Sequence, residues 1–396
     1  MRRSGLRTAS LVFGMIGGAV ARAGGTIRCR LAVVVTACVS LAACDSSAVA
    51  PSGTSSLFIG ADISALARIE QAGGVFRDGG QPGDAIAILR ARGSSGFRLR
   101  LFVSPNDSDV QVNDLAYTVR LAGRIRAAGG RLLLDLHYSD TWADAGHQSP
   151  PAAWAALPFD TLVRRVETYT DSVVTALKQA GALPDIVQVG NEIDDGMLWP
   201  LGRLDEPGSD SLTQWSQFTD LLKAGIRGVR DALAPGDSVR IMLHYSQGGS
   251  AAGTQWFFDH VSAYSVPYDI IGVSYYPWWQ GPIGYLQANL SAEAQRYGKD
   301  VMVVETSYPW RAGGWESLAT NRVAMTWPVS AQGQAQFLAD VAGAVAAVPS
   351  GHGAGVVWWY PEAIQVPGLF VWGGGSLALF DTTGNVLPAA SVLRQP

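Results

Sequence analysis

Eight short apolar runs, separated by longer amphipathic stretches, constrain the fold of this 396-residue chain more than any other feature. Most of the runs are rich in Val, Ile and Leu and show little polar alternation, which is typical of parallel strands buried on both faces. We therefore predict eight strands, at residues 57–61, 97–103, 132–137, 185–191, 239–244, 269–276, 301–305 and 355–359.

The stretches between the runs have the periodicity of helices, most clearly at 113–128, 161–179, 211–233 and 330–348. Asn113 offers an N-cap for one of them, and Gly129 and Gly130 follow its end. Strand and helix repeated eight times predict an α/β fold, a (β/α)8 TIM barrel formed by a single domain. An open doubly wound sheet is the competing interpretation, but no Gly-x-Gly-x-x-Gly motif follows the first run.

The N-terminal region has the pattern of an export signal. Residues 28–44 combine arginines, an apolar run and small residues before Cys44. Because the end of this segment resembles a bacterial lipobox, we predict a lipoprotein-type signal peptide at 1–43 and lipidation of Cys44. A flexible tether at 44–56 and a barrel at 57–396 would follow. With a lipidated Cys44, the protein is expected to be anchored to a membrane, at the periplasm or the cell surface. The alternative is a plain secretory signal in which Cys44 stands by chance, and the protein would then be secreted.

Charge and cysteine content exclude several classes of partner. Six arginines precede the first acidic residue, Asp45, so the remaining chain carries 23 basic residues against 33 acidic ones. A body with this net charge of −10 is a poor candidate for nucleic-acid binding, which needs clustered Lys and Arg. No cysteine follows Cys44, so the body has no disulfide and no cysteine metal site.

Polar and aromatic side chains gather where the predicted strands end. In a barrel, the loops at the carboxyl ends of the strands build the active site. The strand ends therefore predict one functional site, and they carry Asp62, Arg98, Arg100, Asp135, His137, Asn191, Glu192, His244, Tyr275, Tyr276, Glu305, Trp358 and Trp359.

Glu192 and Glu305 are the candidates for catalysis, because each directly follows a buried apolar run. Burying two carboxylates in a barrel mouth costs free energy unless they are paired or used in a reaction. Each could instead pair with an arginine or cap a helix, but two at facing strand ends indicate glycoside hydrolysis. Whether such a pair retains or inverts configuration depends on the distance between the carboxylates, which the sequence leaves open.

Arg98 and Arg100 alternate with apolar neighbours and are predicted to face the barrel interior. An interior arginine would lower the pKa of a nearby nucleophile. The alternative is a structural ion network with Asp62 or Asp135, which we favour for at least one arginine. The Asn191 amide, next to Glu192, is suited to hold a ring hydroxyl of a sugar.

Several segments resemble glycoside hydrolase family 53, the arabinogalactan endo-β-1,4-galactanases. The most specific are LDLHYSDTWADAGHQ (134–148) and VQVGNEIDDGMLWPLG (187–202). Others lie at 60–76, 151–154, 241–246, 271–279, 301–310 and 378–388, so that the resemblance spans residues 60–388.

The resemblance implies that Glu192 is the acid/base and Glu305 the nucleophile of a double displacement with retention. It also implies that Asn191 binds the sugar 2-hydroxyl and that Arg98 orients Glu305. The remaining residues implied to line the sugar subsites are His137, Asp140, Trp142, His244, Tyr276 and Trp359.

Two features depart from the family. A Trp-Glu-Pro run is usual near the eighth strand, but here the chain reads Trp359-Tyr360-Pro361, which replaces an expected carboxylate. Some relatives bind calcium after the seventh strand, yet residues 311–328 contain Glu316 as their one acid. We therefore predict no metal site and no cofactor.

The sequence thus predicts a monomeric, lipid-anchored, retaining endo-hydrolase of β-1,4-galactan or arabinogalactan. It would meet a membrane only through its anchor. One alternative is a related barrel hydrolase acting on another β-linked chain such as mannan. The other is a non-catalytic lipoprotein that binds galactan.

Overall fold

The computed structural model of the chain describes residues 57–204, 211–317 and 319–394. The predicted signal peptide, Cys44 and the tether lie outside the described residues. Among the helices that the structure describes, none is both long enough and apolar enough to cross a membrane.

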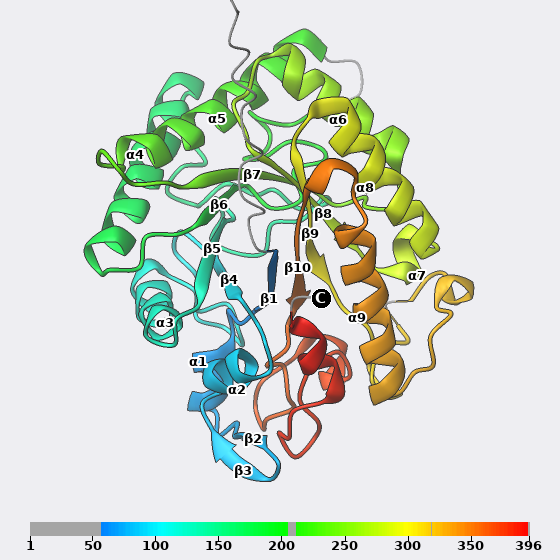
Figure 1. Cartoon of the computed structure of the whole chain (residues 1–396). Helices are drawn as coiled ribbons and strands as arrows, with labels where there is room; N and C mark the ends of the chain where they lie inside the picture. The colour runs from blue at the N-terminus through cyan, green and yellow to red at the C-terminus, as the bar shows by residue number, and fades with distance from the viewer. Residues whose placement is uncertain (1–56, 205–210, 318, 395–396) are drawn as a thin grey trace, which may run out of the picture. The chain divides into compact units, whose positions relative to one another are not determined.

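Eight parallel strands form a closed barrel, as the sequence predicts (Figure 1). Each strand pairs with its neighbours in the chain, and β1 closes the barrel by pairing with both β4 and β10. The barrel strands are β1 (Phe58–Asp62), β4 (Gly96–Leu101), β5 (Arg131–Leu136), β6 (Ile186–Val189), β7 (Arg240–Tyr245), β8 (Ile270–Tyr275), β9 (Asp300–Thr306) and β10 (Gly353–Trp359).

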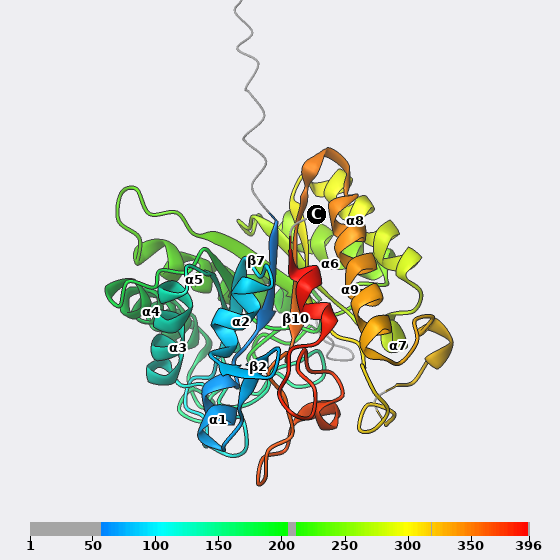
Figure 2. The ribbon, with the colours of Figure 1, turned by 60° about the horizontal axis from the view of Figure 1, so that its bottom comes forward.

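Helices surround the barrel in the order of the chain (Figures 1 and 2). The four helices predicted from periodicity are α3, α4, α5 and α9, with ends within two residues of the prediction. The predicted Asn113 cap is wrong: the Asp114 side chain accepts the Tyr117 N–H, while the Asn113 amide donates to the Ser64 carbonyl. The α-helices are α1 (Leu66–Gln71), α2 (Ala85–Ala91), α3 (Leu115–Ala127), α4 (Phe159–Gln179), α5 (Ser211–Asp231), α6 (Ala251–Ala263), α7 (Pro277–Gln280), α8 (Ile283–Tyr297) and α9 (Ala331–Ala346).

The shorter elements lie in the connections. The link from β1 to β4 carries a small hairpin of β2 (Phe76–Asp78) and β3 (Gln81–Gly83), which the sequence analysis does not predict. Single turns of 3-10 helix occur at Arg322–Ala324, Pro349–Gly351, Trp372–Gly375 and Pro388–Leu393.

The barrel interior has an apolar layer below a polar one. In β1, Phe58, Gly60 and Asp62 alternate and so share the inner face. Apolar inner positions of the strands form a buried cluster of Phe58, Leu133, Ile186, Met242, Ile270, Met302, Val304, Ala354 and Val357. In β4 to β8, inner side chains nearer the carboxyl ends are polar, namely Arg98, Asp135, Gln188, His244 and Ser274, so the polar layer lies toward the carboxyl ends. A second, larger apolar core packs the strands against the helices.

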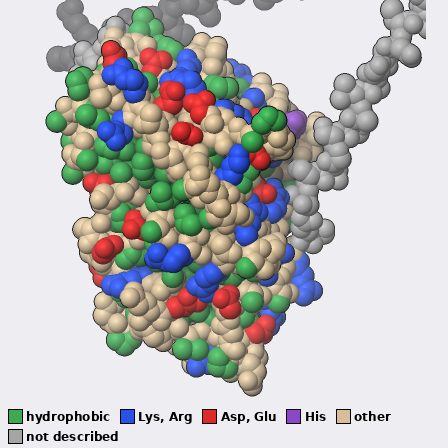
Figure 3. Space-filling model, turned by 90° about the vertical axis from the view of Figure 1, so that its left-hand side faces the viewer, with side chains coloured by type: hydrophobic (Ala, Val, Ile, Leu, Met, Phe, Trp, Pro, Cys, Tyr) green, Lys and Arg blue, Asp and Glu red, His purple; other side chains and the backbone are tan. Residues whose placement is uncertain are grey.

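Charges of both signs are mixed on the outer surface over the helices. Lys and Arg side chains alternate with Asp and Glu on the face that Figure 3 shows. A typical pair joins Arg227 of α5 to Glu167 of α4 at 2.6 Å, with both side chains partly exposed. Such exposed pairs contribute about 0–1 kcal/mol each, so the stability of the fold rests mainly on the apolar cores.

The close approach of β1 to β4 leads to a stability prediction. A Cβ at Gly60 would lie 2.1 Å from the carbonyl oxygen of Gly96, a backbone atom that has no room to move. We expect Gly60→Ala to lower the free energy of unfolding by at least about 1–3 kcal/mol, measured by urea denaturation. Gly123→Ala in α3 is the control, because its Cβ meets nothing within 4 Å, and it should stabilise by up to about 1 kcal/mol. Equal stability of the two variants would contradict this account.

Candidate active site

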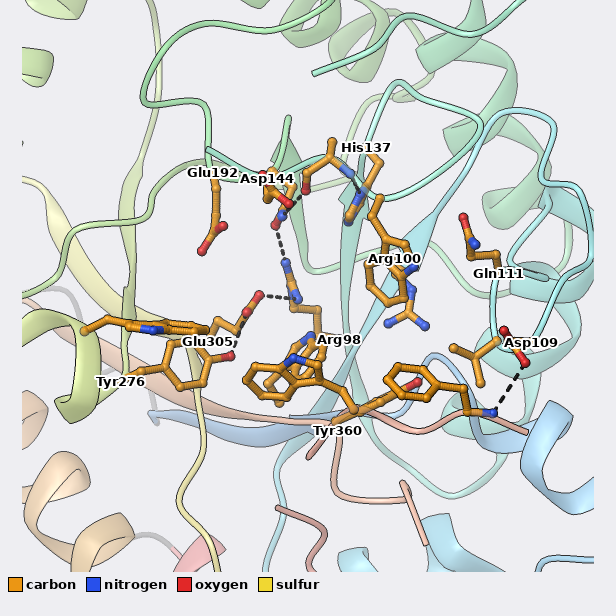
Figure 4. Close-up of a pocket in the computed structure, with 18 residues that line it drawn as sticks. Arg98, Arg100, Asp109, Gln111, His137, Asp144, Glu192, Tyr276, Glu305 and Tyr360 are labelled. Atoms are coloured by element: carbon orange, nitrogen blue, oxygen red, sulfur yellow. Dashed lines mark hydrogen bonds and ion pairs between the residues drawn. The ribbon is translucent and has the colours of Figure 1, made fainter. Parts of the chain in front are cut away.

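A cavity of about 380 Å³ lies at the carboxyl ends of the strands, where the sequence predicts the site (Figure 4). It contains both glutamates and most of the predicted binding residues. The lining residues are Arg98, Arg100, Asp109, Val110, Gln111, His137, Trp142, Ala143, Asp144, Asn191, Glu192, Tyr276, Trp279, Glu305, Trp359, Tyr360, Phe370 and Trp372.

Arg98 stands at the centre of the polar layer and is almost completely buried. Its guanidinium contacts Asp62 and Asp135 at 2.8 Å each, and both of these carboxylates are fully buried. It also donates to the Gln188 side chain at 3.2 Å and to the Asn191 side chain at 2.7 Å. The same guanidinium therefore contacts both the ion network and, at 3.4 Å, Glu305.

Glu305 faces the cavity with 13% of its side chain exposed. A bulge between β8 and β9 falls at Val304, so that Val304 and Glu305 both point into the barrel. The Tyr276 hydroxyl donates to Glu305 Oε1 at 2.7 Å. Burial raises the pKa of Glu305, while the charge of Arg98 and the Tyr276 hydrogen bond oppose that rise.

Glu192 lies across the cavity in a different environment. It follows the short strand β6, where Gly190 and Glu192 itself take left-handed backbone angles with φ of 83° and 46°. The Ser274 hydroxyl donates to Glu192 Oε1 at 2.5 Å. Burial and the nearby charge of Glu305 raise the pKa of Glu192 well above its usual value. Arg98 and the Tyr276 hydroxyl stabilise the ionised form of Glu305, whereas the opposing effect on Glu192 comes from the Ser274 hydroxyl, so we expect Glu305 to ionise first.

Asn191 and His137 line the cavity but are already engaged with the protein. The Asn191 amide group donates to the Ala143 carbonyl at 2.8 Å, which fixes its oxygen toward Arg98. His137 Nε2 lies 2.9 Å from Asp135, and its Nδ1 accepts the Ala143 N–H at 3.0 Å. Both side chains are therefore held rigidly at the edge of the cavity.

Two of the predicted subsite residues do not line the cavity. His244 is fully buried beneath Asn191 and Glu192, where its ring contacts Asn191, Gln188 and Ser274. Asp140 binds the loop instead, since its carboxylate accepts the N–H groups of Ser104 and Ala152 at 2.9 Å each. Their positions give both residues structural contacts and no direct access to a ligand in the cavity.

Aromatic side chains form one wall of the cavity. The predicted residues Trp142, Tyr276 and Trp359 are among them, and Trp142 packs edge-on against Trp359. Trp279 and Trp372, which were not predicted, extend this wall. Phe370 is 70% exposed and its N–H lies 3.4 Å from the Asp109 carboxylate, so the loops after β10 and β4 meet there.

The departure at Tyr360 is accompanied by a nearby carboxylate. Tyr360 is buried with a left-handed φ of 69°, and Glu362, two residues later, is fully buried and accepts the Ala65 N–H at 2.8 Å. Burial and the charge of Asp62 raise the pKa of Glu362 to about 8. The Arg100 guanidinium lies 4.1 Å from the centre of the Trp142 ring and 3.9 Å from the Asp62 carboxylate, and within the described parts of the chain its nitrogens have no hydrogen-bond partner.

Besides Trp279 and Trp372, three polar residues of the site and its surroundings escaped the sequence analysis: Gln188, Ser274 and Glu362. Gln188 occupies the second inner position of β6, above Ile186, and Ser274 occupies the third inner position of β8, in phase with Ile270 and Gly272. The sequence signal that could have identified them is a polar residue on the same face of a predicted strand as a buried apolar residue. Among the described residues, no group of three or more His, Cys, Asp or Glu side chains is arranged to hold a metal ion.

A barrel with two facing carboxyl groups of unequal surroundings and an aromatic wall defines a glycoside hydrolase. Residues 58–393 match the sequence profile described as glycosyl hydrolase family 53, and the chain belongs to that family.

Named relatives and a solved structure agree with this family. The chain is 37% identical to the probable arabinogalactan endo-beta-1,4-galactanase A of Aspergillus terreus, over 81% of this chain and 90% of that one. It is 32% identical to the arabinogalactan endo-beta-1,4-galactanase of Cellvibrio japonicus, over 84% and 89%. The structure of the Ignisphaera aggregans GH53 catalytic domain superposes with a TM-score of 0.78 at 33% identity, over 87% and 98%.

The ion network around Arg98 predicts a large loss of stability when the cation is removed. Arg98→Met leaves the buried carboxylates of Asp62 and Asp135 without their counter-charge, so we expect the free energy of unfolding to fall by about 3–5 kcal/mol in urea denaturation. Arg124→Met is the control, because its side chain is 33% exposed and pairs with partly exposed Glu70 and Asp84. That variant should lose about 1 kcal/mol or less. A loss at Arg98 no greater than at Arg124 would show that the network does not act as described.

Proposed function

We propose that the protein is an endo-acting hydrolase that cleaves β-1,4-galactosidic linkages in galactan and arabinogalactan with retention of configuration. The observation that carries this proposal is the asymmetry of the two glutamates, of which Glu305 contacts Arg98 and Tyr276 while Glu192 contacts a serine. The substrate class is supported by the names of the relatives from Aspergillus terreus and Cellvibrio japonicus.

In the first step, the ionised Glu305 attacks the anomeric carbon and Glu192 gives its proton to the departing glycosidic oxygen. This breaks the bond between two sugars and forms a glycosyl ester on Glu305. In the second step, Glu192 takes a proton from water, and the water oxygen replaces Glu305 at the anomeric carbon. Two inversions at the same carbon give overall retention.

The surroundings of each glutamate suit these functions. Arg98 and the Tyr276 hydroxyl stabilise the ionised form of Glu305, which a nucleophile needs. The raised pKa of Glu192 keeps its proton available until the leaving oxygen needs it. Trp359 and Trp372, at 4.6 Å between ring centres, offer apolar faces to the sugar rings, which present C–H groups on one side.

The substrate is tested by incubating the purified protein separately with linear β-1,4-galactan and β-1,4-mannan, following chain length and new reducing ends. We expect rapid shortening of galactan alone. Glu305→Gln should lower the rate by more than about 10³-fold, because the variant lacks the nucleophile.

Other outcomes of this experiment contradict the proposal in different ways. Cleavage of mannan in place of galactan would keep the two-glutamate chemistry and overturn the substrate. Tight binding of galactan with no cleavage would identify a binding protein. A product with inverted configuration, detected by NMR at early times, would exclude the covalent intermediate.

The pKa shifts predict the pH dependence of the reaction. Activity needs Glu305 ionised and Glu192 protonated, so kcat/KM should rise as pH passes the pKa of Glu305 and fall as pH passes that of Glu192. Because both pKa values lie above those of ordinary carboxyls, we expect a bell-shaped profile with both limbs displaced upward. An acidic limb near pH 4.5, the usual value for a glutamate, would contradict the assigned environment of Glu305.

A further inference from the structure

Ser274 and His244 contact Glu192 from beneath the cavity, although neither lines it. Both side chains are fully buried and stand at inner positions of the neighbouring strands β8 and β7. Among the described residues, Ser274 is the one whose side chain donates a hydrogen bond to the Glu192 carboxyl group. The two residues are therefore placed to act on the reaction through Glu192 and not through the substrate.

Three contacts join these side chains into a closed ring that begins and ends at Glu192. The Glu192 N–H lies 3.4 Å from His244 Nδ1. His244 Nε2 lies 2.9 Å from Ser274 Oγ, and Ser274 Oγ lies 2.5 Å from Glu192 Oε1. The ring thus connects the main chain of Glu192 to its own carboxyl group.

The direction of the hydrogen bonds follows from the ionised state of Glu192. An ionised carboxylate oxygen can only accept, so the Ser274 hydroxyl donates to Glu192 Oε1 at 2.5 Å. The serine oxygen, 2.9 Å from His244 Nε2, then accepts from the ring. Burial keeps the ring neutral by lowering the pKa of His244, which leaves the lone pair on Nδ1 beside the Glu192 N–H.

With a lone pair at Nδ1, the hydrogen of the neutral imidazole is on Nε2. That hydrogen is donated to Ser274 Oγ, which leaves the serine hydroxyl hydrogen free to point at Glu192 Oε1. Every link then runs in one direction, and Oε1 is an acceptor whether Glu192 is ionised or protonated.

We propose that Ser274 and His244 are positioning residues that reserve Glu192 Oε1 as an acceptor and so direct the catalytic proton to Oε2. The proton given to the glycosidic oxygen leaves Oε2, and the proton taken from water returns to Oε2. The hydrogen bond from Ser274 to Oε1 persists through both steps. This inference rests on the proposed function of Glu192 as the acid/base.

The ring also explains how a strained residue is held. Glu192 has a left-handed φ of 46°, a conformation that is unfavourable for a residue other than glycine. Contacts to both its main chain and its carboxyl group keep the side chain at one position over the cavity. A change of function from acid to base then needs no movement of the carboxyl group.

The charged groups around Glu192 set the sign of the expected pH effect. Burial and the charges of Glu305, Asp194 and Asp144 raise its pKa, and the Ser274 hydrogen bond lowers it. Removing the hydroxyl therefore raises the pKa of Glu192 further, which makes the protonated carboxyl a weaker acid toward the glycosidic oxygen in the first step.

The test compares Ser274→Ala with Ser274→Thr on galactan across pH. We expect Ser274→Ala to lower kcat by about 10- to 100-fold, because it removes a hydrogen bond to a charged group, and to leave KM within about two-fold. The alkaline limb of its pH profile should move to higher pH. Ser274→Thr, which keeps the hydroxyl, should restore both the rate and the profile. An unchanged profile and kcat in Ser274→Ala would overturn the proposal.

A second measurement reads the hydrogen-bond direction itself. The chain has five histidines, so ¹⁵N NMR resolves their ring nitrogens, and the His244→Phe variant assigns the signals of His244. We expect the hydrogen on Nε2 on both sides of the Glu192 titration. A hydrogen on Nδ1 would overturn the proposal even if Ser274→Ala were slow, since the chain would then run the other way.

A control separates failure of this inference from failure of the proposed function. Glu192→Ala should be inactive toward galactan if Glu192 is the acid/base, whatever Ser274 does. Activity in Glu192→Ala would overturn the function assigned to Glu192. An inactive Glu192→Ala beside a fully active Ser274→Ala would overturn the inference about Ser274 alone. Urea denaturation of each variant shows whether it is folded.

Discussion

The Arg98 guanidinium, buried between Asp62 and Asp135, is the interaction on which the rest of the site depends. This buried cation is tolerated because five side-chain oxygens surround it, those of Asp62, Asp135, Gln188, Asn191 and Glu305. The same group reaches Glu305, so the charge that completes the barrel interior also sets the ionisation of the candidate nucleophile. Arg98 thus contributes both to the stability of the ion network and to the ionisation of Glu305. A substitution at Arg98 is therefore expected to change both.

The charge of Arg98 lies in the upper of two layers of side chains that fill the barrel interior. The lower layer is a cluster of buried apolar side chains, which covers the polar layer from below. The upper layer opens to the cavity, where the glutamates meet a substrate. Electrostatic effects in such a position exceed those at a surface, because the solvent that would screen them is excluded on one side.

Much of the fold and of the candidate site was predictable from the sequence, because the signals for them lie in short segments of the chain. Buried parallel strands read as continuous apolar runs, so all eight were found, and Glu192 and Glu305 followed because they end such runs. Tyr276, Trp142 and Trp359 were placed correctly at the cavity. The contacts of His244 and Asp140 were not predictable, since whether a strand-end side chain reaches the cavity or the layer beneath depends on the packing of its neighbours. Glu362 escaped because the chain turns at Tyr360 through a left-handed angle that spacing alone does not reveal.

The closure of the barrel by β1 and β10 has a consequence for the order of assembly. Strand β1 pairs with β10, and the contact of Ala65 with Glu362 joins residues 297 positions apart in the chain. Glu305, Trp359 and Glu362 all belong to the last third of the sequence, whereas Asp62 and Arg98 belong to the first part. Contacts of such long sequence separation form late in folding, because loop closure must precede them. A chain emerging during synthesis therefore lacks part of the candidate site until its final strand is in place, so the site and the fold are completed together.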